Sequence, residues 1–451
     1  MNIETGKKFL NEKNYLEAEK IFLNLLNKDE NLLLVNYCLG GIYFELDKYD
    51  KSKLHYKNCL KLKPNSIQTL QTLINLANLE ETHGKLESAK KIYEKLISLF
   101  PENIRAYYGI YILDEKYLKN EYETVFKNIV SKSSNFYDKG IAFYLLSKIS
   151  KRKGNLNEEI NYLHKGHHNI FSSKLDYNKQ SNYYYQKIIS KKFNHIEYLN
   201  FKKKSCNKNN KQLFIIGLPR SGSTLIENLL SNEKSLTDLG ENAFVNMAMI
   251  NQLKNKIFQK NFNPENFVLK FNYIELEKFV LDRIKERIKD KGSLNFIDKT
   301  LVNFFNIDVI LSIFPDAKFI HCFRNKYDSI IAIYQSLLPT LSWTHNLEEI
   351  LDYIDNYLRV VTYFKSKYPD KIIDVNLEDL TNNKIKESKK IFNFCQIKWS
   401  DDYVNFKERN DLIIKTTSNV QLRGKIKNYD YNKYQDYKFI IKKYKKKYKW
   451  L

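Results

Sequence analysis

Hydrophobic residues recur at helical spacing through the first 170 residues of the chain, in segments that polar turns separate. Three of these segments, 15–22, 49–56 and 85–93, resemble one another in sequence. Aligned on their small residues, they are 34 and then 37 residues apart. Pro64 and Pro101 follow the second and third segments and are expected to end the helices there. The pattern predicts consecutive pairs of helices.

Two weaker segments, 107–127 and 142–159, extend this pattern, so we expect about five helix pairs. Gly40, Ser52 and Ala89 are small enough to let paired helices approach closely. The unit resembles the tetratricopeptide repeat, a helix–turn–helix of 34 residues. Two roles stay open for such an α-solenoid: a concave surface for a protein or peptide, and a scaffold that only steadies its neighbour.

The pattern changes near residue 200. Residues 201–211 are polar and basic and predict a linker between a repeat domain, 1–200, and a second domain, 212–451. The hydrophobic run Leu213-Phe214-Ile215-Ile216 predicts a buried parallel strand. A glycine-containing turn, 217–224, and a helical segment follow this strand directly. A strand, a turn and a helix in this order form a phosphate cradle, because N–H groups at the helix start point at the anion.

The side chains of the turn suit an anionic ligand. Ser221, Ser223 and Thr224 add hydroxyl donors beside Gly222, and Arg220 offers a permanent cation. A P-loop of the NTPase kind would place a lysine where Ser223 stands. We also expect no hydrophobic strand that ends in a metal-binding aspartate, so magnesium-dependent phosphoryl transfer fits poorly. Sulfuryl transfer needs no metal, because cationic side chains and backbone amides neutralise the leaving phosphate.

The turn resembles the 5′-phosphosulfate-binding loop of sulfotransferases, in the arginine-bearing version of protein-tyrosine sulfotransferases and of bacterial repeat-fused relatives. Four later segments resemble other motifs of this family: Gly240-Glu241, Asp298-Lys299 with Asn303-Phe304, 314–325 and 416–423. The resemblance implies an α + α/β chain: a repeat solenoid, then a P-loop-like, three-layer α/β domain with a mostly parallel sheet. It implies 3′-phosphoadenosine 5′-phosphosulfate (PAPS) as the donor and an unidentified hydroxyl acceptor, which the sequence leaves open among protein tyrosine, saccharide, lipid head group and small molecule.

The resemblance also implies roles for individual residues. Ala332 stands where the family has a serine eight residues beyond Arg324, and Lys326 replaces a proline, so Ser329 is the nearest hydroxyl. The nucleotide-binding candidates are Arg220, Ser221, Gly222, Ser223 and Thr224 for the 5′-phosphosulfate, Arg324 and Ser329 for the 3′-phosphate, and Ser418 and Arg423 in the late segment. Asn325, directly after Arg324, is expected to cap a helix.

Two residues are expected to take part in the reaction. Glu241 is the candidate general base, because a hydroxyl must lose its proton as it attacks sulfur. Asn242 stands where tyrosine-modifying enzymes carry a second glutamate, so Asp298 remains an alternative base. Lys299 would stabilise the leaving phosphate. A structural reading stays open for both candidates: Glu241 as an acid at a helix start and Lys299 in an ordinary ion pair. His321 lies in an apolar strand and is expected to pack in the core.

Composition adds a few constraints. The chain has 451 residues and a formal net charge of +23, which favours an anionic partner unless a general bias toward lysine explains it. Five scattered cysteines predict neither disulfides nor a zinc site and favour the cytoplasm. We expect no signal peptide, membrane span, bound metal or nucleic-acid partner; the basic end, 444–450, predicts a solvated, frayed helix. Two rival functions remain: an adaptor with a decayed nucleotide domain, and a P-loop kinase or ATPase.

Overall fold

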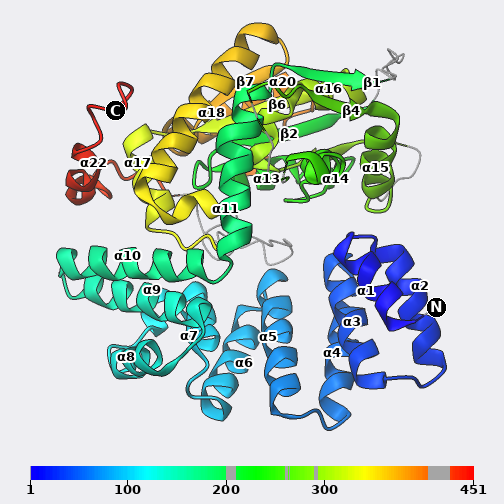
Figure 1. The fold of residues 1–451 in the computed structure, drawn as a ribbon, viewed down its shortest axis with the longest axis vertical. Coiled ribbons are helices and arrows are strands. Elements are labelled where there is room, and N and C mark those ends of the chain that lie inside the picture. The colour runs from blue at the N-terminus through cyan, green and yellow to red at the C-terminus, as the bar shows by residue number, and fades with distance from the viewer. Residues whose placement is uncertain are drawn as a thin grey trace. The chain divides into compact units, whose positions relative to one another are not determined.

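The computed structural model describes residues 2–199, 210–257, 259, 263, 265–288, 293–404 and 427–451. They form two compact units, drawn in Figure 1. The first contains residues 2–134 and 141–159, and the second contains 135–140, 160–404 and 427–451 apart from the short gaps. Most of the expected linker lies outside the described residues, so the domain boundaries at 200 and 212 stay predictions.

The first ten helices form five consecutive pairs, which confirms the expected solenoid (Figure 1). Pro64 and Pro101 each follow the second helix of a pair by a few residues. The pairs are α1 (Ile3–Asn11) with α2 (Tyr15–Asn27), α3 (Leu32–Glu45) with α4 (Tyr49–Lys61), α5 (Ser66–Thr82) with α6 (Leu86–Leu99), α7 (Ile104–Leu113) with α8 (Tyr122–Lys132), and α9 (Phe136–Arg152) with α10 (Leu156–Ser172); the short 3-10 helix η1 (Glu115–Tyr117) follows α7.

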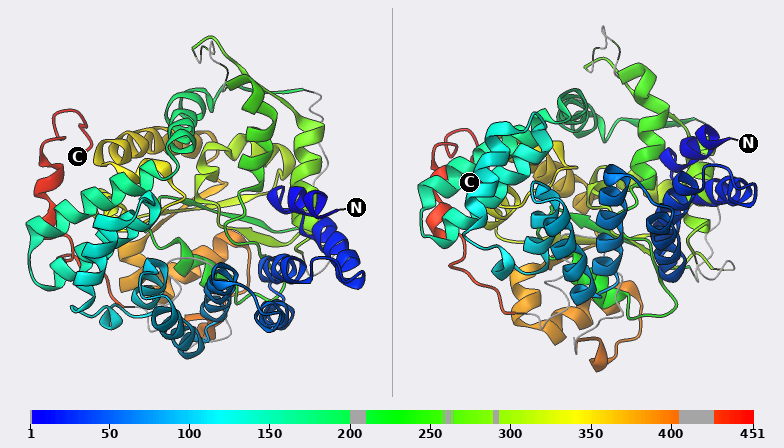
Figure 2. Two further views of the ribbon diagram at one scale, coloured as in Figure 1. Left: turned by 60° about the horizontal axis from the view of Figure 1, so that its bottom comes forward. Right: turned by 90° about the horizontal axis from the view of Figure 1, so that it is seen from below.

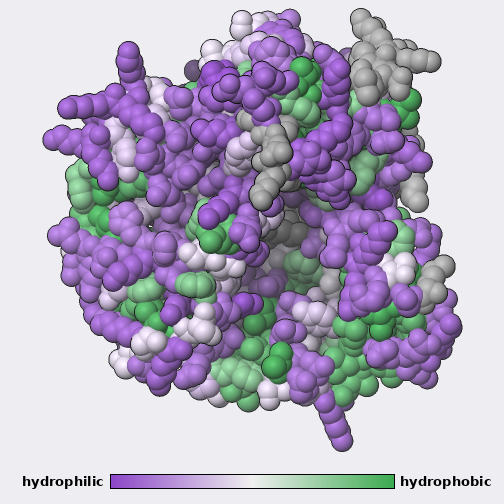
Figure 3. All heavy atoms as spheres, viewed as in Figure 1, coloured by the Kyte–Doolittle hydropathy of each residue, from purple (hydrophilic) through white to green (hydrophobic). Residues whose placement is uncertain are grey.

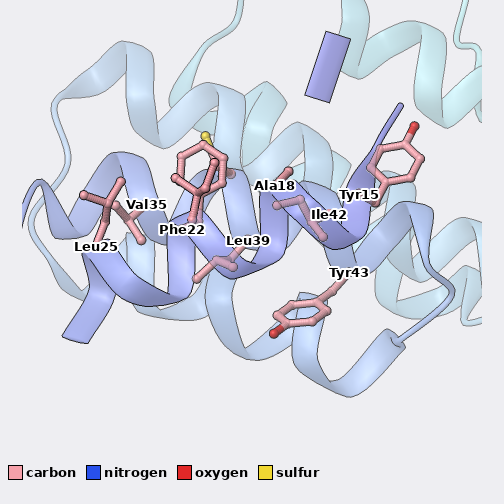
Figure 4. Close-up of a cluster of buried hydrophobic side chains, with 10 residues drawn as sticks. Tyr15, Ala18, Phe22, Leu25, Val35, Leu39, Ile42 and Tyr43 are labelled. Atoms are coloured by element: carbon pink, nitrogen blue, oxygen red, sulfur yellow. The ribbon is translucent and has the colours of Figure 1, made fainter. Parts of the chain in front are cut away.

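Small residues allow close packing within these pairs, as the sequence predicts. A Cβ atom on Gly40 would lie 2.6 Å from Cε1 of Tyr56, so no larger residue fits there without a shift. The Ser52 hydroxyl donates to the carbonyl oxygen of Gly40 at 2.7 Å. Ala18 and Phe22 are fully buried in a cluster that α2 and α3 share, shown in Figure 4. Each pair thus buries its hydrophobic face only with the help of the next.

The second unit contains a five-stranded sheet in which every pair of neighbouring strands is parallel. All six residues of the predicted strand β2 are buried, so its continuous hydrophobic run marks a strand covered on both faces. The strand order is β3 (Thr237–Asp238), β5 (Phe296–Asp298), β2 (Gln212–Gly217), β6 (Lys318–Phe323) and β7 (Ile372–Asn376). All five carboxyl ends therefore meet at one edge.

The strand order reverses at the centre of the sheet. From β2 the chain proceeds to β3 and β5 on one side, and then crosses to β6 and β7 on the other. In open α/β sheets, ligands bind at the carboxyl ends of the strands where the order reverses. The topology therefore points to the ends of β2 and β6, whose residues Gly217 and Cys322 are paired in register.

Helices lie on both faces of this sheet, which gives the expected three layers (Figure 2). They are α13 (Ser223–Leu230), α14 (Phe244–Ile257), α15 (Tyr273–Lys285), α16 (Ile307–Ile313), α17 (Lys326–Tyr334), α18 (Leu347–Lys367), α19 (Leu377–Asn382) and α20 (Lys384–Cys395). The other elements are α11 (Leu175–Tyr183), the π-helix η2 (Tyr184–Ile189), α12 (Ser190–Lys192), the paired strands β1 (Ile196–Leu199) and β4 (Leu269–Asn272), the 3-10 helices η3 (Leu301–Phe305), η4 (Ser342–His345), η5 (Asp401–Val404) and η6 (Gln435–Tyr437), and α22 (Phe439–Lys442).

The basic end of the chain is not the frayed helix that the sequence predicts. Beyond the four-residue helix α22 it forms turns that pack against α18. The Tyr448 hydroxyl donates to Asp352 at 2.6 Å, and the Trp450 indole donates to Asp355 at 2.9 Å. The prediction counted lysines and overlooked the aromatic residues between them, which have donors to offer an acidic helix face.

Most side chains on the face shown in Figure 3 are hydrophilic, and the hydrophobic ones gather in separate patches. Among the described residues, no helix is both long enough and hydrophobic enough to cross a lipid bilayer.

Candidate functional site

The turn between β2 and α13 has a backbone that its glycines permit. A Cβ atom on Gly217 would lie 2.2 Å from the carbonyl oxygen of Cys322 on β6, so this strand end tolerates only glycine. Gly222, at φ 89°, is the N-cap of α13, and a Cβ atom there would lie 2.5 Å from Cδ1 of Leu377. Arg220 takes a left-handed conformation, with φ 65°, although it has a side chain. A non-glycine residue seldom keeps such a backbone unless its surroundings impose it.

The hydroxyl groups of the turn are buried and held. The Ser221 hydroxyl donates to the carbonyl oxygen of Leu218 at 2.6 Å, inside the turn itself. Ser223 and Thr224 begin α13, so their N–H groups belong to the first turn of the helix and lack intrahelical acceptors. Lys299 donates to the Thr224 hydroxyl at 3.4 Å. The described loop thus offers backbone N–H groups and a helix dipole to an anion.

The sheet brings the second arginine to this turn. Arg324 follows β6 directly, and its guanidinium donates from Nη1 to the carbonyl oxygen of Arg220 at 3.2 Å. Two arginines that lie 104 residues apart in sequence therefore meet at the central strand ends. Asn325 accepts from the N–H groups of Tyr327 and Asp328, which confirms its predicted role as the cap of α17.

Arg324 itself is largely buried, with 7% of its side chain exposed. Its Nε donates to the Tyr429 hydroxyl at 3.2 Å, and the Tyr429 hydroxyl in turn donates to Asp328. The rings of Tyr429 and Tyr434 lie 5.0 and 5.3 Å from the guanidinium carbon. Burial lowers the pKa of Arg324, but the tyrosines and Asp328 more than offset this and raise it. The sequence analysis overlooked Tyr429, which lies 105 positions from the residue it contacts.

Lys299 stands at the other side of β2, directly after β5, and none of its side chain is exposed. Its ammonium group pairs with Oε2 of Glu227 at 2.8 Å and with Oε1 of Glu241 at 3.1 Å. Glu241 follows β3 and keeps 56% of its side chain exposed, so Lys299 links the surface carboxylate to a buried one. The two predicted reaction residues are thus in direct contact.

Several carboxyl groups surround Lys299. Burial lowers its pKa, but Glu227 and Glu241 more than offset this and raise it, so the ammonium form is retained. Burial raises the pKa of Glu227, with Asp238 adding to the rise and Lys299 opposing it. These shifts follow from removing charged groups from water.

The sequence analysis also overlooked Glu227. It lies on α13 inside the run Leu225-Ile226-Glu227-Asn228-Leu229, where every residue is buried. A carboxylate on a buried helix needs a cation nearby, because an unpaired charge in the interior is costly. The position of Glu227 in a hydrophobic run, just after the turn, could therefore have predicted a buried cationic side chain beside it.

The sequence analysis expects no hydrophobic strand that ends in a metal-binding aspartate; one strand does end in an aspartate, and whether it binds a metal is not tested by the structure. Asp298 ends β5, which is fully buried and pairs with β2. At three residues, this strand is too short for its hydrophobic pattern to stand out. Asp298 accepts from the Thr300 N–H at 2.8 Å and from the Asn303 amide at 3.3 Å. Burial raises its pKa to about 6, although the Thr300 hydrogen bonds oppose the shift.

The remaining predicted residues have simpler surroundings. The Ser329 hydroxyl donates to the carbonyl oxygen of Asn325 at 3.0 Å, within the first turn of α17. Ala332 is buried one turn further on. His321 is buried in β6 as expected, with Nδ1 2.7 Å from Asp374 and Nε2 in contact with the Tyr357 hydroxyl. Ser418 and Arg423 lie outside the described residues, so their roles stay predictions.

The described residues suit an anionic ligand such as a phosphate group. The turn that Gly217 and Gly222 permit presents N–H groups, and the guanidinium of Arg324 donates to the backbone of this turn at Arg220. Each of these groups prefers anionic oxygen. No group of three or more histidine, cysteine, aspartate or glutamate side chains arranged to hold a metal ion occurs among the described residues.

Comparisons with known proteins agree with this arrangement. Residues 212–401 match the model of a sulfotransferase family, and residues 31–102 match that of the tetratricopeptide repeat. An uncharacterized protein of Aquifex aeolicus is 21% identical over 384 residues, which cover 83% of this chain and 49% of that protein. A TPR repeat-containing protein of Methanocaldococcus jannaschii is 30% identical over 144 residues, covering 32% of this chain and 23% of that protein. The chain thus spans about half the length of the first relative and about a quarter of the second.

Two solved structures are also similar. A sulfotransferase domain from the curacin biosynthetic pathway has 16% identity and a TM-score of 0.32, with 49% of this chain and 84% of that chain covered. A sulfotransferase of Mycobacterium tuberculosis has 11% identity and a TM-score of 0.30, with 67% and 97% covered. At these scores, nothing about the reaction follows from either structure.

Proposed function

We propose that the chain transfers a sulfuryl group from PAPS to a hydroxyl group, because residues 212–401 match a sulfotransferase family and residues 31–102 match the tetratricopeptide repeat. The observation that carries the proposal is the convergence of three cations at one edge of the parallel sheet. Arg220, Lys299 and Arg324 follow the adjacent strands β2, β5 and β6. Such cations neutralise a phosphate leaving group without a metal ion.

We assign the donor to the turn between β2 and α13. The N–H groups at the start of α13 and the guanidinium of Arg220 would hold the 5′-phosphosulfate, and Arg324 would hold the 3′-phosphate, with Ser329 nearby. When bound, PAPS supplies an activated sulfuryl group and a bisphosphate leaving group. Lys299 contacts the Thr224 hydroxyl at the helix start, which places its charge beside this turn. Ser418 and Arg423 stay candidate contacts from the late segment.

Glu241 is the proposed general base. Its carboxylate is oriented by the ion pair with Lys299 and remains exposed enough to receive a proton from an acceptor hydroxyl. Asp298, the alternative base, is 2% exposed and already accepts hydrogen bonds from Thr300 and Asn303. These contacts favour a structural role for Asp298 and leave the proton transfer to Glu241.

Two further assignments are less specific. The acceptor could be a protein tyrosine, a saccharide or a small molecule, and a peptide or protein would dock on the repeats. The four cysteines of the described chain are buried free thiols, which favours a reducing compartment such as the cytoplasm.

The test is transfer of labelled sulfate from PAPS to cell fractions. Arg220→Ala is expected to abolish transfer with little loss of folding, and Lys278→Ala, which removes an exposed cation of α15, serves as the matched control. Glu241→Gln is expected to lower the rate about a hundredfold or more, whereas Glu275→Gln on the surface of α15 changes nothing. Equal transfer by wild type and Arg220→Ala would remove the assignment of the turn.

One observation favours a second candidate, a kinase or ATPase. Asp298 ends a strand beside β2, which is where a P-loop NTPase holds magnesium. Calorimetry with adenosine 3′,5′-bisphosphate and with magnesium ATP separates the two. Binding of the bisphosphate alone supports the sulfotransferase. Turnover of ATP supports the alternative, and binding of neither nucleotide points to a non-catalytic adaptor.

A further inference from the structure

Glu241, the proposed general base, lies in the segment 239–243, which connects β3 to α14. Lys299 holds this segment before Glu241, because its backbone N–H donates to the carbonyl oxygen of Gly240 at 3.1 Å. The ammonium group of the same lysine pairs with the Glu241 carboxylate at 3.1 Å. The position of this carboxylate therefore depends on where the backbone of the segment lies relative to Lys299.

Ala243, at the other end of the segment, has an unusual backbone. Its φ of 54° lies in the left-handed region, although it is not a glycine. This conformation is costly for a residue with a Cβ atom, and alanine has no polar side chain that could offset the cost by a local hydrogen bond. The carbonyl oxygen of Ala243 accepts from the N–H of Met247 at 2.8 Å, a bond that the residue before a helix normally makes. Another contact must therefore impose the left-handed backbone.

Thr300 supplies this contact. Its hydroxyl accepts from the N–H of Ala243 at 2.9 Å. Thr300 is 5% exposed, so little water is available to replace the bond. Its own backbone is fixed on both sides, because its N–H donates to the buried carboxylate of Asp298 at 2.8 Å and its carbonyl oxygen accepts from the N–H of Asn303 at 2.9 Å. A fixed hydroxyl thus holds a strained backbone two residues beyond the proposed base.

We propose that Thr300 is a positioning residue for the general base. Its hydroxyl keeps Ala243 in the left-handed conformation and thereby keeps the carboxylate of Glu241 against the ammonium group of Lys299. The inference rests on the proposed function for the role of Glu241 in the reaction. Without the hydroxyl, the N–H of Ala243 loses its acceptor, and the backbone relaxes toward the right-handed region and moves Glu241. A displacement of about 1 Å can slow a reaction about a hundredfold.

The first test is Thr300→Val, which removes the hydroxyl and keeps the shape of the side chain. The turnover number kcat should fall about tenfold or more, whereas the Kd of adenosine 3′,5′-bisphosphate, measured by calorimetry, should stay unchanged. Thr300→Ser keeps the hydroxyl and should retain most of the rate. Thr344→Val is the matched control, because Thr344 is fully buried in η4 and its hydroxyl donates to the carbonyl oxygen of Leu341 at 2.7 Å. It should transfer sulfate like wild type.

A second test uses the strain at Ala243. Glycine adopts a left-handed φ without strain, so a chain that carries Ala243→Gly does not need the hydroxyl to impose this backbone. In that chain, the additional loss caused by Thr300→Val should shrink to about threefold or less. The crystal structure of Thr300→Val gives a readout that does not depend on the reaction. Ala243 should leave the left-handed region, and Glu241 should lie beyond the ion-pair distance of about 4 Å from Lys299.

Four results would overturn the proposal. They are transfer by Thr300→Val at the wild-type rate, a loss that Thr300→Ser shares, a loss that is equally large beside Ala243→Gly, and a variant structure in which Ala243 and Glu241 stay in place. A weaker Kd that accounts for the whole loss would also overturn it, since Thr300 would then act on the donor.

The outcome stays separate from that of the proposed function. If the wild type transfers no sulfate, the proposed function fails, and the crystal structure alone decides whether Thr300 holds the segment. If Thr300→Val does not fold, Thr300→Cys takes its place in every measurement, because a thiol is a weak acceptor on a side chain of similar size.

Discussion

Two buried cations on opposite sides of β2 have different surroundings. Lys299 pairs with two carboxylates at 2.8 and 3.1 Å. Arg324 has one carboxylate oxygen, of Asp328, at the longer distance of 3.6 Å, and is otherwise held by the hydroxyl of Tyr429 and the carbonyl oxygen of Arg220. The charge of Lys299 is thus compensated in place, whereas most partners of Arg324 are neutral.

This difference separates two roles. A cation with two fixed carboxylates holds those carboxylates in position and gains little from one more anion. A cation whose partners are mostly neutral gains more, because an arriving phosphate replaces a hydroxyl or carbonyl with a charge-assisted contact. The comparison favours the hypothesis that Lys299 positions its carboxylate partners as well as facing the leaving phosphate, and that Arg324 is the stronger binder of the anion.

The largest expected effect is on folding stability at Lys299. Lys299→Met leaves Glu227 buried without its cation, and removing one partner of a buried pair costs about 3–5 kcal/mol. Urea denaturation measures the loss. Replacing both partners, in Lys299→Met with Glu227→Leu, should recover most of it, and Lys278→Met at an exposed position should cost little. A single variant as stable as wild type would show that Lys299 does not compensate these carboxylates.

Asp298, which lies next to Lys299 in sequence, should make the folded chain less stable as the pH rises from 4 to 6. The pKa of Asp298 is raised to about 6 in the folded chain, from an ordinary value of about 4. The folded state therefore binds more protons between these values, and stability from this group, present below about pH 4, is lost as pH rises through 6. Asp298→Asn should remove about 3 kcal/mol of this pH dependence, measured as denaturation midpoints from pH 4 to 7. A variant that follows the wild-type pH profile contradicts the shift.

The sequence could predict those residues of the site that lie close to one another in the chain. Gly217, Arg220 and Gly222 stand together in one turn between a hydrophobic strand and a helix, so their chemistry is visible within eight residues. Glu227 and Tyr429 act on partners 72 and 105 positions away. The pairing of β5 with β2 brings Glu227 and Lys299 together, and β5 was itself too short to predict. The strand end at Asp298 was missed for the same reason. Tyr429 lies outside the sheet, in the chain that follows residue 426, so no strand pattern leads to it.

A smaller effect compares two glycines on the two sides of the site. Gly222 and Gly240 both have left-handed backbones, at φ 89° and 65°, but only Gly222 has a close neighbour, Leu377. Gly222→Ala should lower the free energy of unfolding by about 2–3 kcal/mol and Gly240→Ala by about 1 kcal/mol, because the second substitution introduces backbone strain but no steric contact. Thermal and urea unfolding check the order. Equal costs would mean that the contact with Leu377 relaxes freely.

The smallest expected effect tests whether Arg324 exchanges its neutral partner for an anion. Tyr429→Phe removes the hydroxyl that accepts from Nε of Arg324 and leaves the ring stacked beside the guanidinium. Adenosine 3′,5′-bisphosphate should then bind about threefold more tightly, because one competing hydrogen bond is gone. Calorimetry measures this, with Tyr431→Phe, an exposed tyrosine, as the control. Weaker binding would assign the Tyr429 hydroxyl to the nucleotide itself, and the neutral surroundings of Arg324 would then belong to a preformed binding site, which an incoming phosphate joins without displacing any partner.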